Sequence, residues 1–359
     1  MDSSQSAVLQ KILVGAAKRR AASIHFAVNV YPMLRVDGQM VELRDEQLIT
    51  PQFIEQFADS VLTPEQKKIL TEQRELTTVV DLAGKFRLKV NLFYQKNSLA
   101  AAIRIIPIQI PLLINLGLPK SMYKLSELND GLVIIAGPYG SGRSTTAASI
   151  LEEINKTRKA TIVTIEKPLE FLHTNKLSLI EQREVGRDVN SFADALRYCQ
   201  EIDVDVISVG VNSETETLPL VVEFASSGRL VVQQMDTVSV LQTIEEIIAA
   251  FGKETERAQT LLAAALQAII VQRLVPRVGG GLALAAEVLI ANGPVRSLIG
   301  EGRNKQLTTI LQSSRAEGMS TLDQSLADLV RSGEVLLDHA VEYADDPNSL
   351  RTRARGNVS

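Results

Sequence analysis

A short apolar segment that runs directly into a glycine-rich turn limits what this chain can fold into. The segment GLVIIAG is followed by PYGSGRSTT, so that the turn and the residues after it occupy 137–146. Three residues match the phosphate-binding pattern G-x-x-x-x-G-K-[ST]: Gly137, Gly142 and Ser144. Arg143 stands where the pattern has lysine. A strand, a glycine turn and a helix in this order predict a phosphate loop, because backbone N–H groups and a helix N-terminus then face an anion.

The loop supplies the candidate nucleotide-binding residues. We expect the phosphates of ATP or ADP to contact Gly137, Gly140, Ser141, Gly142, Arg143, Ser144 and Thr145. Ser144 keeps the hydroxyl that binds Mg²⁺ in this motif. Arg143 is not equivalent to lysine, because its planar fork is wider than a compact ammonium group. It can still bind phosphate, but we expect the positioning of the γ-phosphate, on which phosphoryl transfer depends, to be lost.

Composition narrows the function classes. The chain has 359 residues and 45% hydrophobic residues, enough for two or three domains with real cores. A net charge of −4 argues against a nucleic-acid-binding protein. Cys199 is the only cysteine, which excludes an intrachain disulfide and a cysteine zinc site, and we expect it to be a small apolar residue on a helix. No apolar run is long enough for a membrane span, so we expect a cytoplasmic protein without membrane insertion.

The first part of the chain predicts an α+β domain over residues 1–106. Residues 24–49 read as strands, with a tight hairpin at Asp37-Gly38. Two helices are expected to begin at threonine–proline pairs, Thr50-Pro51 and Thr63-Pro64. Two further strands follow, at residues 85–95 and 99–106. Prolines and glycines over 107–129 predict a linker.

The second part alternates apolar runs with helical patterns, which predicts an α/β domain with a parallel sheet over 130–290. The expected strands are 131–137, 161–165, 204–210 and 229–234. Residues 255–275, TERAQTLLAAALQAIIVQRLV, read as one long helix that ends at Pro276. A helical region over 291–345 and a disordered tail over 346–359 complete the prediction.

Several longer stretches resemble one family. INKTRKATIVTIEKPLEF, QREVGRDVNSFADALR, LQAIIVQRLVPRVGGG and GMSTLDQSLADLVRSG are similar to the PilT-type type IV pilus retraction ATPases of the type II/IV secretion ATPase superfamily. The resemblance implies a PAS-like N-terminal domain, a RecA-like P-loop ATPase domain and a hexameric ring with ATP and Mg²⁺ at subunit boundaries. It also implies an inner-membrane pilus platform protein as partner. Related extension ATPases carry a four-cysteine zinc module, so the retraction branch fits better and no zinc is expected.

The departures from the family lie in its chemical motifs. The Walker B segment has Val211 where the family has the glutamate that activates water, and loss of a general base costs about 10²–10⁴-fold in rate. The acidic box TIEKPLEF retains Glu166 and Glu170, while Lys167 reverses one charge. The histidine box G-H-L-V-F-G-T-L-H-T reads GRLVVQQMDT, in which Arg229 and Asp236 replace the histidines. The helical run A-I-R-N-L-I-R-E reads PVRSLIGE and retains Arg296.

The resemblance also implies that N-domain arginines contact a neighbouring subunit's nucleotide. Arg87 and Arg104 occupy the matching positions. Ordinary solvated strand arginines are an equally good interpretation of both, because arginine is mostly exposed in proteins.

Three functions remain open. The first is a pseudo-ATPase that keeps the fold and acts as a regulatory or structural partner, in a homo-hexamer or in a mixed ring with an active paralogue. The second is a slow ATPase in which Glu166 or Glu214 replaces the lost carboxylate. The third is a switch that binds ATP without hydrolysing it.

Overall fold

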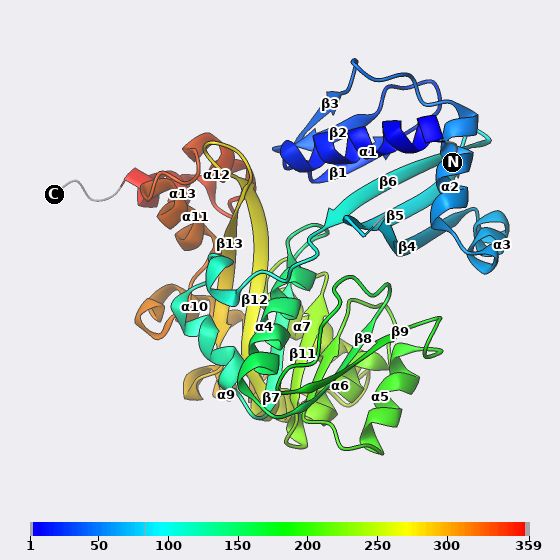
Figure 1. The fold of residues 1–359 in the computed structure, drawn as a ribbon. Coiled ribbons are helices and arrows are strands. Elements are labelled where there is room, and N and C mark those ends of the chain that lie inside the picture. The colour runs from blue at the N-terminus through cyan, green and yellow to red at the C-terminus, as the bar shows by residue number, and fades with distance from the viewer. Residues whose placement is uncertain (1–2, 83, 356–359) are drawn as a thin grey trace. The chain divides into compact units, whose positions relative to one another are not determined.

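The structure is a computed structural model that describes residues 3–82 and 84–355. The chain divides into two compact units, with the boundary between Gln109 and Ile110 (Figure 1). None of the described helices combines the length and the apolar character that a membrane span requires.

The first unit contains a six-stranded antiparallel sheet in the order β3-β2-β1-β6-β5-β4. Its strands are β1 (Ser23–Phe26), β2 (Met33–Val36), β3 (Gln39–Glu42), β4 (Glu75–Leu82), β5 (Phe86–Gln95) and β6 (Ser98–Ile106). Its helices are α1 (Ser3–Lys18), α2 (Pro51–Val61) and α3 (Pro64–Gln73). Phe26 of β1 meets Phe53 and Phe57 of α2 edge to face, which places the core between sheet and helix.

Local sequence signals in this unit are confirmed. Asp37 and Gly38 both have positive φ, 49° and 83°, as the two-residue turn between β2 and β3 requires. The Thr50 hydroxyl accepts a hydrogen bond from the Phe53 N–H at 3.1 Å, and Thr63 forms a capping box with Gln66. Strand β4 was not predicted, and it pairs with β5 along its whole length.

The second unit contains a seven-stranded sheet in the order β13-β12-β7-β11-β10-β8-β9. Its strands are β7 (Gly131–Ala136), β8 (Thr161–Glu166), β9 (Leu179–Glu184), β10 (Val206–Val209), β11 (Leu230–Met235), β12 (Leu266–Pro276) and β13 (Leu282–Ile290). All pairs are parallel except β12 with β13. The four predicted strands, β7, β8, β10 and β11, are confirmed and form the centre of the sheet.

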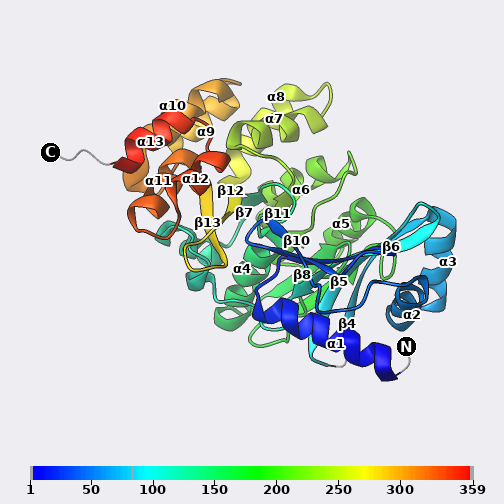
Figure 2. The same cartoon turned by 90° about the horizontal axis from the view of Figure 1, so that it is seen from above.

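Helices cover both faces of this sheet (Figures 1 and 2). One face carries α4 (Arg143–Thr157), and the other carries α5 (Phe192–Gln200), α6 (Thr217–Ser226), α7 (Val240–Ala250) and α8 (Thr255–Ala265). The buried Cys199 lies on α5, as predicted. The remaining helices are α9 (Gly293–Gly300), α10 (Leu307–Ser313), α11 (Leu322–Arg331), α12 (Leu337–Tyr343) and α13 (Pro347–Arg355), with short 3₁₀ turns at Asn304–Gln306 (η3) and Arg315–Glu317 (η4).

The predicted linker over 107–129 is wrong for most of its length. Residues from Ile110 onward belong to the second unit and form two 3₁₀ segments, η1 (Leu113–Asn115) and η2 (Lys120–Glu127). The apolar side chains Leu113, Met122 and Leu125 are buried in one cluster with α4 and the central strands. The prolines interrupt regular structure here, but the apolar residues between them complete one face of the core.

The long helix predicted over 255–275 is also wrong. Helix α8 ends at Ala265, and Leu266 adopts extended dihedral angles (φ −61°, ψ 130°) at the start of β12. The alanine-rich first half is a good helix former, whereas the second half contains the β-branched residues Ile269, Ile270 and Val271. Pairing with β7 on one side and β13 on the other decides the strand conformation.

The predicted disordered tail is wrong for residues 347–355, which form α13, while 356–359 lie outside the described residues. Leu350 on this helix is fully buried. The Asp323 carboxylate accepts hydrogen bonds from the backbone N–H groups of Asp345 and Asp346 at 2.9 and 3.0 Å. These contacts hold α13 against α11, near the β12–β13 hairpin (Figure 1).

Candidate nucleotide site at the glycine loop

The glycine loop joins the end of β7 to the start of α4 in the predicted order. Gly137, Gly140 and Gly142 all have positive φ, at 143°, 84° and 94°. If residue 137 had a Cβ atom, this atom would lie 2.5 Å from the backbone carbonyl oxygen of Gln272 and 2.5 Å from the hydroxyl oxygen of Ser141. The loop therefore needs glycine at this position both for its backbone angle and for space.

Buried polar atoms without a hydrogen-bond partner line this loop. The Ser141 side chain is 3% exposed and its hydroxyl has no partner. On β12, the side-chain Nε2 of Gln272 donates to the Thr146 hydroxyl at 2.7 Å, while the side-chain oxygen Oε1 of Gln272 has no partner. Since a buried polar group is costly when unpaired, the Ser141 hydroxyl is suited to donate to an oxygen of a bound phosphate. The Gln272 oxygen can only accept, so it cannot bind phosphate in this way.

Arg143 extends toward the neighbouring strand instead of remaining available to the loop. Its Nη1 donates to the Met235 carbonyl oxygen at 2.6 Å and to the Asp236 carboxylate. The Arg143 side chain is 10% exposed and that of Asp236 is 65% exposed. Because β11 lies beside β7 and runs parallel to it, its carboxyl end reaches the first turn of α4. The two substituted positions thus form one ion pair, which their separate motifs did not predict.

The Ser144 hydroxyl, the predicted ligand of Mg²⁺, lies beside uncharged residues, and its binding of Mg²⁺ stays a prediction. The Ser144 hydroxyl lies 3.4 Å from Oε1 of Gln234, which is buried at the end of β11. The neighbouring Gln233 is buried as well and donates to the Gln234 carbonyl oxygen at 2.6 Å. Across the described part of the chain, no group of histidine, cysteine or acidic residues has a metal-binding arrangement. In the histidine box, Gln233 and Gln234 replace a glycine and a threonine. No role near Ser144 was predicted for them.

The loop after β10 places no carboxylate where the Walker B glutamate is expected. Val211 occupies that position. Three residues later, the Glu214 carboxylate accepts hydrogen bonds from the backbone N–H groups of Phe192 at 3.1 Å and Ala193 at 3.0 Å. These donors belong to the first turn of α5, so Glu214 caps that helix. Asn212 bonds the carbonyl oxygen of Gly210 and the backbone N–H of Glu214.

Glu166 ends β8, two strands away from β11. Burial, together with the smaller effect of the negative charges of Glu170 and Glu184, raises the pKa of its carboxyl group to about 7. A carboxyl group with a pKa near 7 can accept a proton at neutral pH. Glu166 is therefore a retained acidic-box residue with properties suited to proton transfer.

The predicted arginines differ in their local contacts. Arg87 on β5 is buried and Nη1 bonds both carboxylate oxygens of Asp81, at 3.0 and 2.9 Å, which supports a structural role. Arg104 lies on β6 opposite Lys89 of β5, and its contact with a neighbouring subunit stays a prediction. Arg229 precedes β11 and its guanidinium stacks on Phe224 at 5.4 Å. It lies at the amino end of β11, so only Asp236 of the two histidine replacements reaches the loop.

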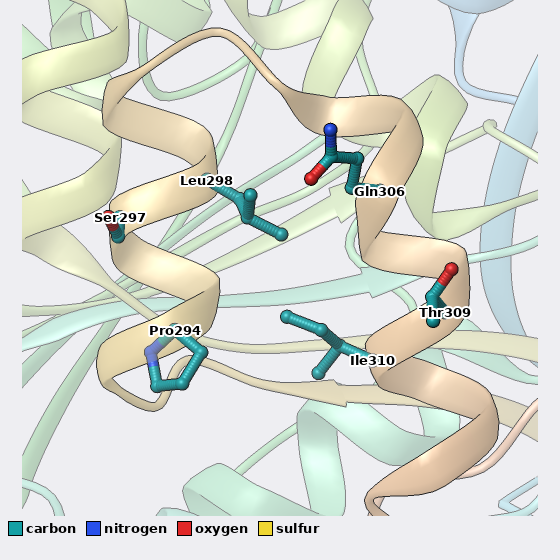
Figure 3. Close-up of a pocket in the computed structure, with 6 residues that line it drawn as sticks. All are labelled: Pro294, Ser297, Leu298, Gln306, Thr309 and Ile310. Carbon is teal, nitrogen blue, oxygen red and sulfur yellow. The ribbon is translucent and has the colours of Figure 1, made fainter.

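A separate pocket of about 460 Å³ lies between α9 and the η3–α10 segment (Figure 3). Its lining residues are Pro294, Ser297, Leu298, Gln306, Thr309 and Ile310. Arg296, retained from the family's helical run, donates to the carbonyl oxygens of Ala263 and Ala264 at 2.6 and 2.7 Å. Arg296 therefore stabilises the carboxyl end of α8.

Comparison with known proteins identifies the family. The model of the type II/IV secretion system protein family matches residues 2–282. This chain belongs to that family. It is 33% identical over 343 residues to the type IV pilus retractation ATPase PilT of Pseudomonas aeruginosa, which covers 95% of this chain and 99% of that protein. It is 36% identical over 321 residues to a twitching motility protein of Neisseria gonorrhoeae, across 89% of this chain and 86% of the relative.

This chain has the same fold as the pilus retraction motor PilT in a crystal structure with bound ADP. The TM-score is 0.81 at 37% identity, over 95% of this chain and 98% of that one. The predicted α/β fold, with a smaller N-terminal domain and a P-loop domain followed by helices, is confirmed. The chain is homologous to the PilT pilus retraction ATPases, as the sequence motifs indicated.

Proposed function

We propose that this chain is a hydrolysis-deficient PilT-like protein that serves a regulatory or structural role in a pilus or secretion motor. The ion pair between Arg143 and Asp236 is the observation that supports this most directly. The residue expected to hold the γ-phosphate is bound to a carboxylate of the same chain. Phosphoryl transfer depends on positioning and charge stabilisation of that phosphate, so this pair removes a main source of catalysis.

The surroundings of the pair support the same proposal. Val211 cannot accept a proton, and Glu214 is engaged in capping α5. The Ser144 hydroxyl lies 3.4 Å from Oε1 of Gln234, a residue without a charge to hold a metal ion. The Walker B position and the carboxylate nearest to it are thus replaced or engaged elsewhere.

Retention of nucleotide is part of the proposal. The positive-φ glycines, the unpaired Ser141 hydroxyl and the start of α4 fit the phosphates of ADP or ATP. The similar PilT structure contains ADP. A bound nucleotide would supply the phosphates that pair with these donors, and Ser141 would hold one of their oxygens.

We also propose that this chain forms a ring in the cytoplasm, either alone or together with an active paralogue. The ring would act on a pilus platform protein of the inner membrane. Arg104 is the candidate contact to a neighbouring nucleotide. Light scattering of the purified chain, alone and mixed with a PilT-type ATPase, measures the assembly. A monomer that stays separate from the paralogue contradicts the ring.

The hydrolysis claim is tested by phosphate release from ATP with Mg²⁺. The native chain should release none above background. The combined substitutions Arg143→Lys, Val211→Glu and Asp236→His, which restore the family residues, should create measurable release. As a control, Arg197→Lys with Val278→Glu makes similar changes at half-exposed positions and should create none. Release by the native chain contradicts the proposal.

A slow ATPase is the second candidate, favoured by the pKa of about 7 at Glu166. In that case the native chain releases phosphate and Glu166→Gln abolishes the release. Glu181→Gln, on the neighbouring strand β9, is the matched control because Glu181 is exposed.

A further inference from the structure

The ion pair between Arg143 and Asp236 bears on which nucleotide the loop binds. In the phosphate-loop motif, the residue at position 143 reaches the β- and γ-phosphates. Here the guanidinium bonds the Asp236 carboxylate and the Met235 carbonyl oxygen. A negative charge of the chain itself therefore lies where the outermost phosphate of a triphosphate would meet residue 143.

The part of the loop nearer to β7 keeps its phosphate-binding features. Ser141 is 3% exposed and its hydroxyl has no hydrogen-bond partner. The hydroxyl oxygen lies 2.5 Å from the point where a side chain at Gly137 would place its Cβ atom. The hydroxyl is thus directed into the turn of the loop. The inner phosphates of a nucleotide would meet these donors before they reach the ion pair.

We infer that this loop binds nucleoside diphosphates in preference to nucleoside triphosphates, and that Asp236 is the residue that sets this specificity. The inference rests on the proposed function, because it requires a loop that still binds nucleotide. It names the ligand class of that site and the residue that excludes the rival ligand.

Charge provides the physical reason. A triphosphate carries one negative charge more than a diphosphate, and its terminal phosphate would meet an Arg143 guanidinium whose charge the Asp236 carboxylate already balances. The Asp236 side chain is 65% exposed, so water weakens its direct repulsion of a phosphate, and the main effect is that Arg143 offers the terminal phosphate no unbalanced positive charge. The buried Gln234, whose Oε1 lies 3.4 Å from the Ser144 hydroxyl, contributes no positive charge that would replace that of Arg143.

The test is calorimetric titration of the full chain with ADP and with β,γ-imido-ATP, a triphosphate that is not hydrolysed. The native chain should bind ADP at least about tenfold more tightly, which corresponds to about 1.4 kcal/mol. Asp236→Asn removes the charge but keeps the size and an oxygen acceptor, so it should bring the two affinities to within about twofold. Asp203→Asn removes the same charge from an exposed residue at the amino end of β10 and should leave the preference unchanged.

Three results would overturn the inference: equal affinities in the native chain, a preference that Asp236→Asn does not alter, or no binding of either nucleotide. Phosphate release from ATP in a parallel assay has a different meaning. It would contradict the proposed loss of hydrolysis, while the affinity ratio, measured with the imido analogue, would still be decided by the titration.

Discussion

Arg143, the first residue of α4, forms an ion pair with Asp236, which lies just after β11 and 93 residues further along the chain. Arg143 replaces the lysine and Asp236 replaces a histidine of the PilT-type motifs. The positive charge of Arg143 is balanced by the negative charge of Asp236. A lone arginine here would leave a guanidinium that is 10% exposed with only the Met235 carbonyl oxygen as partner. The two substitutions are therefore one structural change, in which the residue expected to bind phosphate has become part of the fold.

The free energy of this pair is measurable. Asp236→Ala should destabilise the chain by about 1–2 kcal/mol, because it leaves the Arg143 charge largely buried. The double variant with Arg143→Leu should recover part of this loss, with a coupling energy of about 1 kcal/mol in urea unfolding. The same cycle on Arg303 and Glu301, both about half exposed, should give a clearly smaller coupling energy, because water screens the pair. Equal coupling in both cycles would contradict the assignment.

Glu166 should make stability depend on pH. Its pKa in the folded chain is raised from 4.5 to about 7, so the unfolded chain releases this proton first as the pH rises. Stability should therefore fall between about pH 4.5 and 7 and then level off, by up to about 3 kcal/mol from this group. Glu166→Gln should leave stability unchanged at pH 4 and raise it at pH 8, measured by urea unfolding.

Glu287 serves as an internal comparison for that measurement. Burial raises its pKa to about 7 as well, while its carboxylate accepts a hydrogen bond from the Val240 N–H at 2.8 Å. The Glu166→Gln chain should therefore still lose stability over the same pH range because of Glu287, but less than the native chain loses. A pH profile identical to that of the native chain would show that the Glu166 carboxyl group is ordinary.

Glu214 is expected to matter for stability and not for catalysis. Glu214→Ala should cost about 1–2 kcal/mol, because two N–H groups in the first turn of α5 lose their acceptor. Glu216→Ala, at a residue 66% exposed, should cost less than about 0.5 kcal/mol. Thermal unfolding measures both. A chain whose phosphate release depends on Glu214 would show instead that this carboxylate had taken over from the missing Walker B residue.

The segment over 110–129 should behave as core. Met122→Ala should cost about 2–4 kcal/mol, because Met122 is fully buried against α4 and the central strands. Ile114→Ala in the same segment is the matched control, since Ile114 is 64% exposed and should contribute little. Small and equal effects in unfolding experiments would restore the interpretation of this segment as a linker.

The sequence predicted those features whose causes are local. The turn at Asp37-Gly38 and the caps at Thr50 and Thr63 depend on residues within a few positions of each other, so their patterns were sufficient. The strand–glycine–helix order around Gly137 was equally readable. The motif stretches also indicated the family, which the comparisons confirm.

Other features were decided by contacts between distant segments. Residues 266–276 could form helix or strand from their composition, and pairing with β7 and β13 made them a strand. Leu350 and the residues around Met122 looked exposed or connecting until helices and strands were placed against them. The sequence showed Arg143 and Asp236 as two separate losses. Only the parallel pairing of β7 with β11 brings their opposite charges together, because side chains 93 residues apart meet through the sheet and not through the chain.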